Sequence, residues 1–309
     1  MNTALQRRIL VMMSAFNGER YIGEQIDSIL NQKTEYGITL RIRDDGSTDG
    51  TREVIRDCME KHPGQIEMIE GENIGVNAGF FSLLRGAAGF DYYALSDQDD
   101  IWLEDKLQTA CDAIDGAGEE LPLLYSSVSW LIRDDGRPYG VTRKKTRDFT
   151  IYNTIIQNIC PGHNQVMNQR LLDLLQVDMD PGRLYVHDAW ITNVACLHGR
   201  ILFDNQPHTL YRQSGSNQMG YGSGQLGRLM ASGKRTTRGE GRQYRRQVRH
   251  FIDVYRERAK AIRCYDDIHR YAYAETLGQR IAVVRHGRFY RQSRLETLAF
   301  YLAYVLGAY

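Results

Sequence analysis

The chain has 309 residues, of which 42% are hydrophobic and 25% are charged. This composition is typical of a globular protein with one large domain, or with one domain and an appendage. No apolar run approaches the ~20 residues needed to cross a bilayer, and we expect no signal peptide because residues 1–8 are polar. The five cysteines are scattered without metal-ligand spacing, which predicts reduced thiols in a cytoplasmic protein.

The net charge of +1 hides a strong asymmetry along the chain. Residues 221–309 carry 18 Lys and Arg against 7 Asp and Glu, whereas residues 1–220 carry 21 against 31. The two parts therefore have net charges of +11 and −10. We expect two units with this boundary, and we expect the basic unit to meet an anionic partner, either nucleic acid or phospholipid.

The first 115 residues alternate between strand and helix patterns. Short apolar runs predict strands at 9–13, 38–42, 66–69 and 92–95. Apolar residues at helical spacing predict helices at 22–30, 54–59, 76–84 and 103–114, the second of them capped by Thr48 or Asp49 and ended before Pro63. Such alternation predicts an α/β fold with a mostly parallel sheet flanked by helices.

The pattern changes after residue 120. A strand is expected at 123–132, short mixed elements at 151–220, and a Gly/Ser-rich connector near 222–233 that leads into basic helices. The last helix has an apolar stripe, which comprises Leu295, Leu298, Leu302 and Val305. This stripe predicts a helix that lies in a membrane interface. The alternative is that its apolar face packs against the rest of the protein or a second subunit.

Candidate site residues follow each of the first four predicted strands, at Phe16-Asn17, Asp44-Asp45, Asn73 and 97–100. The carboxyl ends of parallel strands lie at one edge of the sheet, so these residues predict a single composite site. Three carboxylates fall in the last of these segments, at Asp97, Asp99 and Asp100. Burying them unpaired would be costly, whereas Mn²⁺ or Mg²⁺ would be held well by such oxygen ligands. An acidic turn that caps the next helix is the alternative.

Several motifs in order resemble the family 2 inverting glycosyltransferases of the GT-A fold, and most closely the rhamnosyltransferase-like members. The residues that carry the resemblance are SAFNGE (14–19), RDDGSTDGT (43–51), ENIG (72–75), SDQDDIW (96–102) with Lys106, and HDAW (187–190). The resemblance covers roughly residues 8–215. It implies a Rossmann-like GT-A domain at 1–220, to which the basic helical region at 221–309 is added.

The resemblance also implies how a nucleotide sugar is bound. The residues expected to contact it are Ser14, Phe16, Glu19, Asp45, Asn73, Asp97 and Arg212. Phe16 would stack on the base, and Asp45 would accept a hydrogen bond from N3–H of uracil or thymine. Asp97 and Asp99 form the Asp-x-Asp pair that would hold the divalent cation on the diphosphate.

Asp188 falls where the family places its catalytic base. A single inverting displacement needs one carboxylate to take the proton of the acceptor hydroxyl. The alternative for Asp188 is a charge that complements the dipole at a helix start. Weaker expectations place His163, His187 and Trp190 at the acceptor. Related sequences often carry a histidine where this chain has Ser214, so a metal or phosphate contact is not expected there.

We therefore expect an enzyme that transfers L-rhamnose from dTDP-rhamnose to an acceptor hydroxyl of a bacterial surface polysaccharide or lipid-linked glycan. A UDP-hexose donor is the first alternative. A sugar-phosphate nucleotidyltransferase is less well supported, because the first loop lacks a Gly-rich basic sequence. A nucleic-acid-binding protein is equally disfavoured, because the acidic body would repel a polyanion. The expected location is the cytoplasm or the inner face of the cell membrane, where the C-terminal helices contact anionic lipid or a second copy.

Overall fold

The computed structural model describes residues 7–118, 120–213 and 240–309. In that part of the chain, nine strands form one sheet in the order β3-β2-β1-β4-β8-β6-β9-β5, and β7 pairs with β6 beside this path. The strands are β1 Arg8–Ala15, β2 Gly37–Asp44, β3 Ile66–Glu70, β4 Tyr92–Ser96, β5 Ile101–Trp102, β6 Leu123–Ile132, β7 Pro138–Val141, β8 Val166–Asn168 and β9 Arg200–Arg212.

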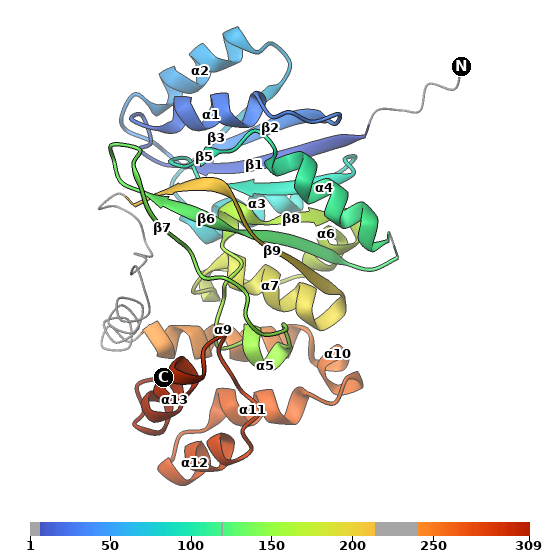
Figure 1. Cartoon of the computed structure of the whole chain (residues 1–309), viewed down its shortest axis with the longest axis vertical. Coiled ribbons are helices and arrows are strands. Elements are labelled where there is room, and N and C mark those ends of the chain that lie inside the picture. Colours follow the sequence, from blue (N-terminus) through green and yellow to red (C-terminus); the bar gives the residue numbers. More distant parts are fainter. Residues whose placement is uncertain (1–6, 119, 214–239) are drawn as a thin grey trace.

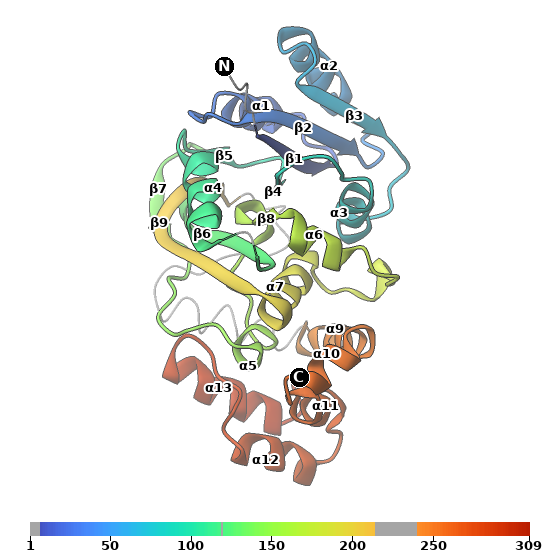
Figure 2. The same cartoon turned by 90° about the vertical axis from the view of Figure 1, so that its right-hand side faces the viewer.

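The helices cover both faces of this sheet (Figures 1 and 2). They are α1 Ile22–Leu30, α2 Thr51–Lys61, α3 Val76–Arg85, α4 Lys106–Ala117, α5 Ile151–Thr154, α6 Gln169–Leu175, α7 His187–His198, α9 Glu240–Val254, α10 Arg256–Ala261, α11 Tyr265–Tyr273, α12 Leu277–Arg285 and α13 Arg294–Val305. Two short 3-10 turns are also present, η1 Gly162–Asn164 and η2 Pro181–Arg183.

The parallel half of the sheet is the one that the alternating pattern predicts. Strand β1 pairs in parallel with β2 and β4, and β2 pairs in parallel with β3. Side chains of β1 enter two separate cores, with Ile9, Val11 and Met13 facing α1, α2 and α4 while Leu10 and Met12 face α3, α6 and α7. Because β1 is buried on both faces, it requires a continuous apolar run, as its sequence has. The expected GT-A-like α/β architecture is confirmed.

The other half of the sheet was not predicted strand by strand. Strand β8 pairs antiparallel with both β4 and β6, and β6 then pairs in parallel with β9. The helix expected from residue 103 begins at Lys106, because Ile101 and Trp102 pair with β9 as strand β5. The position of β8 between β4 and β6 places the turn before β8 beside the carboxyl end of β4, where Leu95 N–H donates to Gln165 O at 3.0 Å.

The C-terminal helices α9–α13 form a further layer beyond α7 (Figure 1). Trp190 of α7 is fully buried, and its ring centroid lies 5.4 Å from that of Phe251 and 5.8 Å from that of Tyr255, both in or next to α9. One apolar core therefore runs from the sheet into the C-terminal layer. The expected unit boundary near residue 220 and the connector at 222–233 lie outside the described residues. No helix within the described ranges is long and apolar enough to span a membrane.

Replacing Phe251 with alanine should lower the free energy of unfolding of the whole chain by about 3–5 kcal/mol, because a fully buried aromatic leaves a cavity. Urea unfolding followed by fluorescence and circular dichroism measures the change. Ile262→Ala is the control, because that side chain is 41% exposed and should change stability by about 0.5 kcal/mol or less. Two separate transitions, with only one shifted, would show that the C-terminal layer is an independent unit.

Candidate functional site

The loops that follow β1, β2 and β4 are tied together by side-chain hydrogen bonds. Gln98 accepts from the backbone N–H of Phe16 at 2.9 Å and donates to its carbonyl at 3.0 Å. Glu19 accepts from the backbone N–H of Gly50 at 3.0 Å, which joins the first loop to the start of α2. The Phe16 ring itself is 44% exposed. The first loop is therefore held rigidly while its aromatic side chain remains open to a ligand.

Asp45 is 2% exposed and organises the loop that precedes α3. Its carboxylate accepts hydrogen bonds from Ile74 N–H and from Gly75 N–H at 2.8 Å, and it pairs with Arg43 at 3.1 Å. A carboxylate offers about four acceptor sites, and four N–H groups, two from Arg43 and one each from Ile74 and Gly75, already donate to that of Asp45. Asp45 thus already has a structural role, and a contact with a base would be added to it.

Ser14 and Asn73 flank the same loop. A Cβ atom at Gly79 would lie 2.6 Å from Ser14 Oγ, so the glycine allows α3 to approach the end of β1 closely. Asn73 is exposed, and its side-chain oxygen accepts from Gly75 N–H at 3.2 Å. The structure places both residues at the expected edge of the sheet. Their contacts with a nucleotide sugar stay predictions.

The acidic segment after β4 meets a histidine from η1. Ligand atoms of Asp97, Asp100 and His163 all lie within 4.8 Å of one another. His163 Nδ1 is 3.6 Å from Asp97 Oδ2 and 3.7 Å from Asp100 Oδ2, while its Nε2 lies 2.9 Å from Ser129 Oγ. Oδ2 of Asp100 is buried and has no hydrogen-bond partner among the described residues. Two carboxylates, one of which has an oxygen without a hydrogen-bond partner, and an imidazole fit a divalent cation.

Burial and mutual repulsion govern the protonation of this segment. Burial, and then the charge of Asp97, raise the pKa of Asp99 to about 6. Burial and the charges of both neighbouring aspartates raise the pKa of Asp100 well above its usual value. Burial also acts to raise the pKa of Asp97, but contact with His163 outweighs it and the pKa falls below normal. A bound cation would replace the proton that the cluster otherwise retains.

Lys106 lies beneath this cluster and is fully buried. Its ammonium group donates to His163 O at 2.5 Å, to Asn164 Oδ1 at 3.1 Å and to Thr209 Oγ1 at 2.8 Å. Burial lowers the pKa of Lys106, while the carboxylates of the acidic segment act in the opposite direction. Three oxygen acceptors match the three N–H groups that only the charged form possesses. Lys106 therefore fixes η1 against β9.

Asp188 is joined to the cluster through the same turn. It is the second residue of α7, and its carboxylate accepts from Gly162 N–H at 3.2 Å and from Ala189 N–H. A charge complementing the helix dipole would have a lowered pKa. Burial instead raises the pKa of Asp188 to about 7. A carboxyl group with this pKa, which binds the residue preceding His163, is suited to accept a proton near neutral pH.

The other two residues of the HDAW motif differ in their surroundings. His187 stacks on Phe80 with ring centroids 4.2 Å apart, and burial lowers its pKa to about 4, so the imidazole is neutral at pH 7. Trp190 is 0% exposed under α9. The expectation that Trp190 contacts an acceptor is therefore wrong, because the C-terminal layer covers it. Ser214 lies outside the described residues.

Arg212 lies behind the acidic segment and is 3% exposed. Its guanidinium pairs with Glu24 at 2.7 Å, donates to Asp99 O at 3.1 Å and lies 4.6 Å from the Tyr21 ring centroid. Its backbone N–H donates to Asp100 Oδ1 at 3.1 Å. Arg212 thus shapes the acidic segment from behind, which the sequence did not indicate. Its predicted contact with the nucleotide sugar is not tested.

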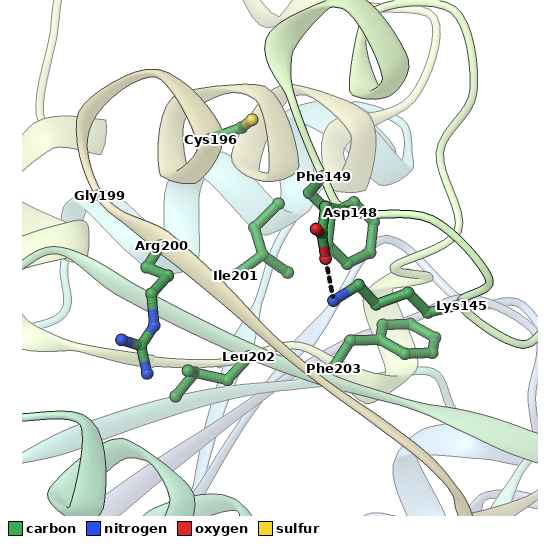
Figure 3. Close-up of a pocket in the computed structure, with 9 residues that line it drawn as sticks. All are labelled: Lys145, Asp148, Phe149, Cys196, Gly199, Arg200, Ile201, Leu202 and Phe203. Carbon is green, nitrogen blue, oxygen red and sulfur yellow. Dashed lines mark ion pairs between the residues drawn. The ribbon is translucent and has the colours of Figure 1, made fainter. Parts of the chain in front are cut away.

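A cavity of about 410 Å³ lies at the other end of β9 and is separate from this site. Figure 3 shows Arg200 and Leu202 of β9 on one side, and Phe203 beside the ion pair of Lys145 with Asp148 on the other. Arg200 begins β9, whereas Arg212 ends it beside the acidic segment. The cavity therefore contributes no residue to the cluster of carboxylates.

Comparison with known proteins gives one family and one fold. The family model described as Glycosyl transferase family 2 matches residues 10–173. The dTDP-rhamnosyl transferase RfbG of Shigella flexneri is 28% identical over 224 residues, which are 67% of this chain and 73% of that protein.

Two solved structures share the fold. TarS 1-349 of Staphylococcus aureus in complex with UDP-GlcNAc has a TM-score of 0.57 at 18% identity, covering 92% of this chain and 93% of that one. The mannosyltransferase PcManGT of Pyrobaculum calidifontis, in complex with GDP-Man and Mn²⁺, has a TM-score of 0.55 at 18% identity, covering 99% and 86%.

Manganese should raise the melting temperature of the protein, because the cation relieves the repulsion among buried carboxylates. At a concentration of 100 times Kd the cation should add about 2.7 kcal/mol to the free energy of unfolding. This stabilisation should be smaller at pH 5 than at pH 8, because at pH 5 Asp99, with a pKa of about 6, holds a proton. Differential scanning fluorimetry measures it. Asp97→Asn should abolish the shift while the exposed Asp135→Asn preserves it; equal shifts in all three proteins would refute the site.

Proposed function

The chain belongs to glycosyl transferase family 2, and we propose that it moves L-rhamnose from dTDP-L-rhamnose to a hydroxyl group of a bacterial surface polysaccharide or lipid-linked glycan. The proposal includes inversion at the anomeric carbon and dependence on Mn²⁺ or Mg²⁺. The observation that supports it most is that one turn, η1, contacts both the acidic cluster and Asp188, a carboxyl group with a raised pKa. The rhamnosyl donor is supported by the similarity to RfbG.

The donor would occupy the edge formed by the loops after β1, β2 and β4. Phe16 is exposed for stacking on the base, and Asp45 lies in the adjoining loop, where a pyrimidine N3–H would share an acceptor oxygen with the N–H groups that Asp45 already binds. The diphosphate would then lie toward the acidic segment. Ser14, Glu19, Asn73 and Arg212 would position this nucleotide through the loops they hold.

Asp97, Asp100 and His163 would hold the cation, and the predicted ligand Asp99 adjoins them. When bound, the cation neutralises charge that develops on the nucleoside diphosphate leaving group. His163 is suited to this role because burial lowers its pKa and keeps the imidazole neutral. This proposed ligand set differs from the Asp97 and Asp99 pair that the resemblance implies, because it includes Asp100, the third carboxylate of the acidic segment, and His163, which was expected at the acceptor.

Asp188 would take the proton of the acceptor hydroxyl as that oxygen attacks the anomeric carbon. Gly162 N–H holds the carboxylate in position, and the low dielectric that raises its pKa also strengthens its basicity. One base and one displacement invert the centre without a covalent intermediate. The neutral His187 beside it is available to hydrogen-bond an acceptor, because its buried Nε2 has no partner among the described residues.

The compartment that we propose is the cytoplasm. All five cysteines, which lie within the described residues, are free thiols. Reduced thiols persist in a reducing compartment. The partners proposed with this location are a nucleotide sugar and a glycan or lipid-linked acceptor.

Asp188→Asn should lower kcat by about 10²–10⁴-fold while leaving the donor Kd unchanged, because the amide keeps the shape of the carboxyl but cannot accept a proton. In the unmodified enzyme kcat/KM should rise with pH through about 7 as Asp188 ionises. Transfer rates and calorimetric donor titrations separate the two effects. The exposed Asp178→Asn is the matched control. A near-normal rate for Asp188→Asn would assign the base to another residue.

A donor panel tests the nucleotide assignment. We expect dTDP-rhamnose to bind more tightly than UDP-glucose or UDP-GlcNAc, and all three to bind more tightly than GDP-mannose, because a purine lacks the pyrimidine N3–H next to Asp45. Calorimetry in the presence of Mn²⁺ measures the four dissociation constants. Preferred binding of a UDP-hexose would change only the assigned donor sugar, whereas preferred binding of GDP-mannose would refute the assignment of a pyrimidine nucleotide.

A further inference from the structure

The last helix packs through a different face from the one that its leucines suggest. Glu296, Phe300 and Tyr304 of α13 are 6%, 2% and 0% exposed. Glu296 pairs with Arg143, and Tyr304 stacks on Tyr271 with ring centroids 5.2 Å apart. This aromatic face closes the core of the C-terminal layer. The expectation that the leucine stripe itself packs against the protein is not met.

The leucines instead point to solvent. Four of them recur at helical spacing along α13 and just after it, and a fifth begins the neighbouring α12. These five residues form what we call the leucine face: Leu277, Leu295, Leu298, Leu302 and Leu306, exposed by 58%, 54%, 64%, 63% and 73%. A single exposed leucine is ordinary, but a stripe of them marks a surface that binds a partner or a membrane.

The charges around the leucine face indicate which kind of partner it binds. Residues 277–309 contain five arginines and a single acid, Glu296, which is buried against Arg143. Arg285 and Arg294 are exposed. A symmetric contact between two copies would bring these cationic surfaces together, whereas the headgroups of an anionic bilayer would neutralise them. The charge therefore favours lipid over a second copy of the chain.

The dimensions of α13 agree with a helix that lies in the plane of a membrane. Its 12 residues extend about 18 Å, which is short of the ~30 Å hydrocarbon core. Figures 1 and 2 place α12 and α13 toward the end of the molecule opposite α2. A surface that is apolar along one stripe and basic at its margins is typical of interfacial binding.

We propose that the leucine face docks the protein on an anionic lipid surface, with the leucine side chains in the acyl boundary and Arg285 and Arg294 at the phosphates. The inference depends on the proposed function only in that a lipid-linked acceptor would lie in the same membrane. The docking itself requires no catalytic residue.

Co-sedimentation of the full chain with vesicles tests the proposal. Phosphatidylcholine vesicles with phosphatidylglycerol should bind the protein, and pure phosphatidylcholine vesicles should bind it much more weakly. Leu295→Gln, Leu298→Gln and Leu302→Gln together should lower the partition constant at least about tenfold, because three apolar side chains lose their insertion. Arg285→Gln with Arg294→Gln should lower it about 25-fold, at about fivefold per arginine.

The matched control replaces three apolar residues exposed elsewhere, Ile69→Gln, Leu121→Gln and Ile262→Gln, and should bind vesicles normally. Unchanged melting temperatures confirm that the variants fold. Normal vesicle binding by the leucine variant, or no binding by the unmodified protein, would overturn the proposal. A dimer that the leucine variant converts to a monomer in light scattering would also overturn it. Donor turnover with a water-soluble acceptor reports on the proposed function separately, because it should be equal in all variants.

Discussion

The arrangement of the site depends on one buried positive charge. Lys106 is fully buried, donates to three oxygen atoms in η1 and β9, and lies 3.8 Å from the ring centroid of Trp102. An ammonium group is stable in such a place only if every N–H is satisfied and negative charge lies nearby. The turn therefore has to adopt one conformation. That conformation directs the His163 side chain to the acidic segment and the Gly162 N–H to Asp188.

Burial affects the acidic segment and Asp188 in the same direction. It raises the pKa of Asp99, of Asp100 and of Asp188. The effect of that shift differs with the surroundings. Among the clustered carboxylates it favours the binding of a cation, whereas at Asp188, which lies outside the cluster, it produces a group that can exchange a proton near neutral pH. Burial thus supports two chemical roles.

The parallel half of the fold and its strand-end residues could be predicted, because local apolar periodicity specifies them. The contribution of His163 and Asp100 as a pair could not, since it depends on β8 inserting antiparallel between β4 and β6. Trp190 was misassigned because its position in a motif does not reveal that α9 covers it. The last helix has two apolar faces, and periodicity alone does not show that the aromatic face, with Phe300, is the buried one.

The contact between α9 and the start of α7 has a consequence for how the protein is made. The side-chain oxygen of Gln247 accepts from Tyr185 N–H at 2.7 Å and from Val186 N–H at 3.0 Å, immediately before α7 begins at His187. This acceptor lies 62 residues further along the chain than Tyr185. During synthesis on the ribosome the sheet emerges before α9, so the two N–H groups that precede α7 meet this acceptor only after α9 has emerged. The start of α7, which carries Asp188, is therefore secured later than the loops after β1, β2 and β4.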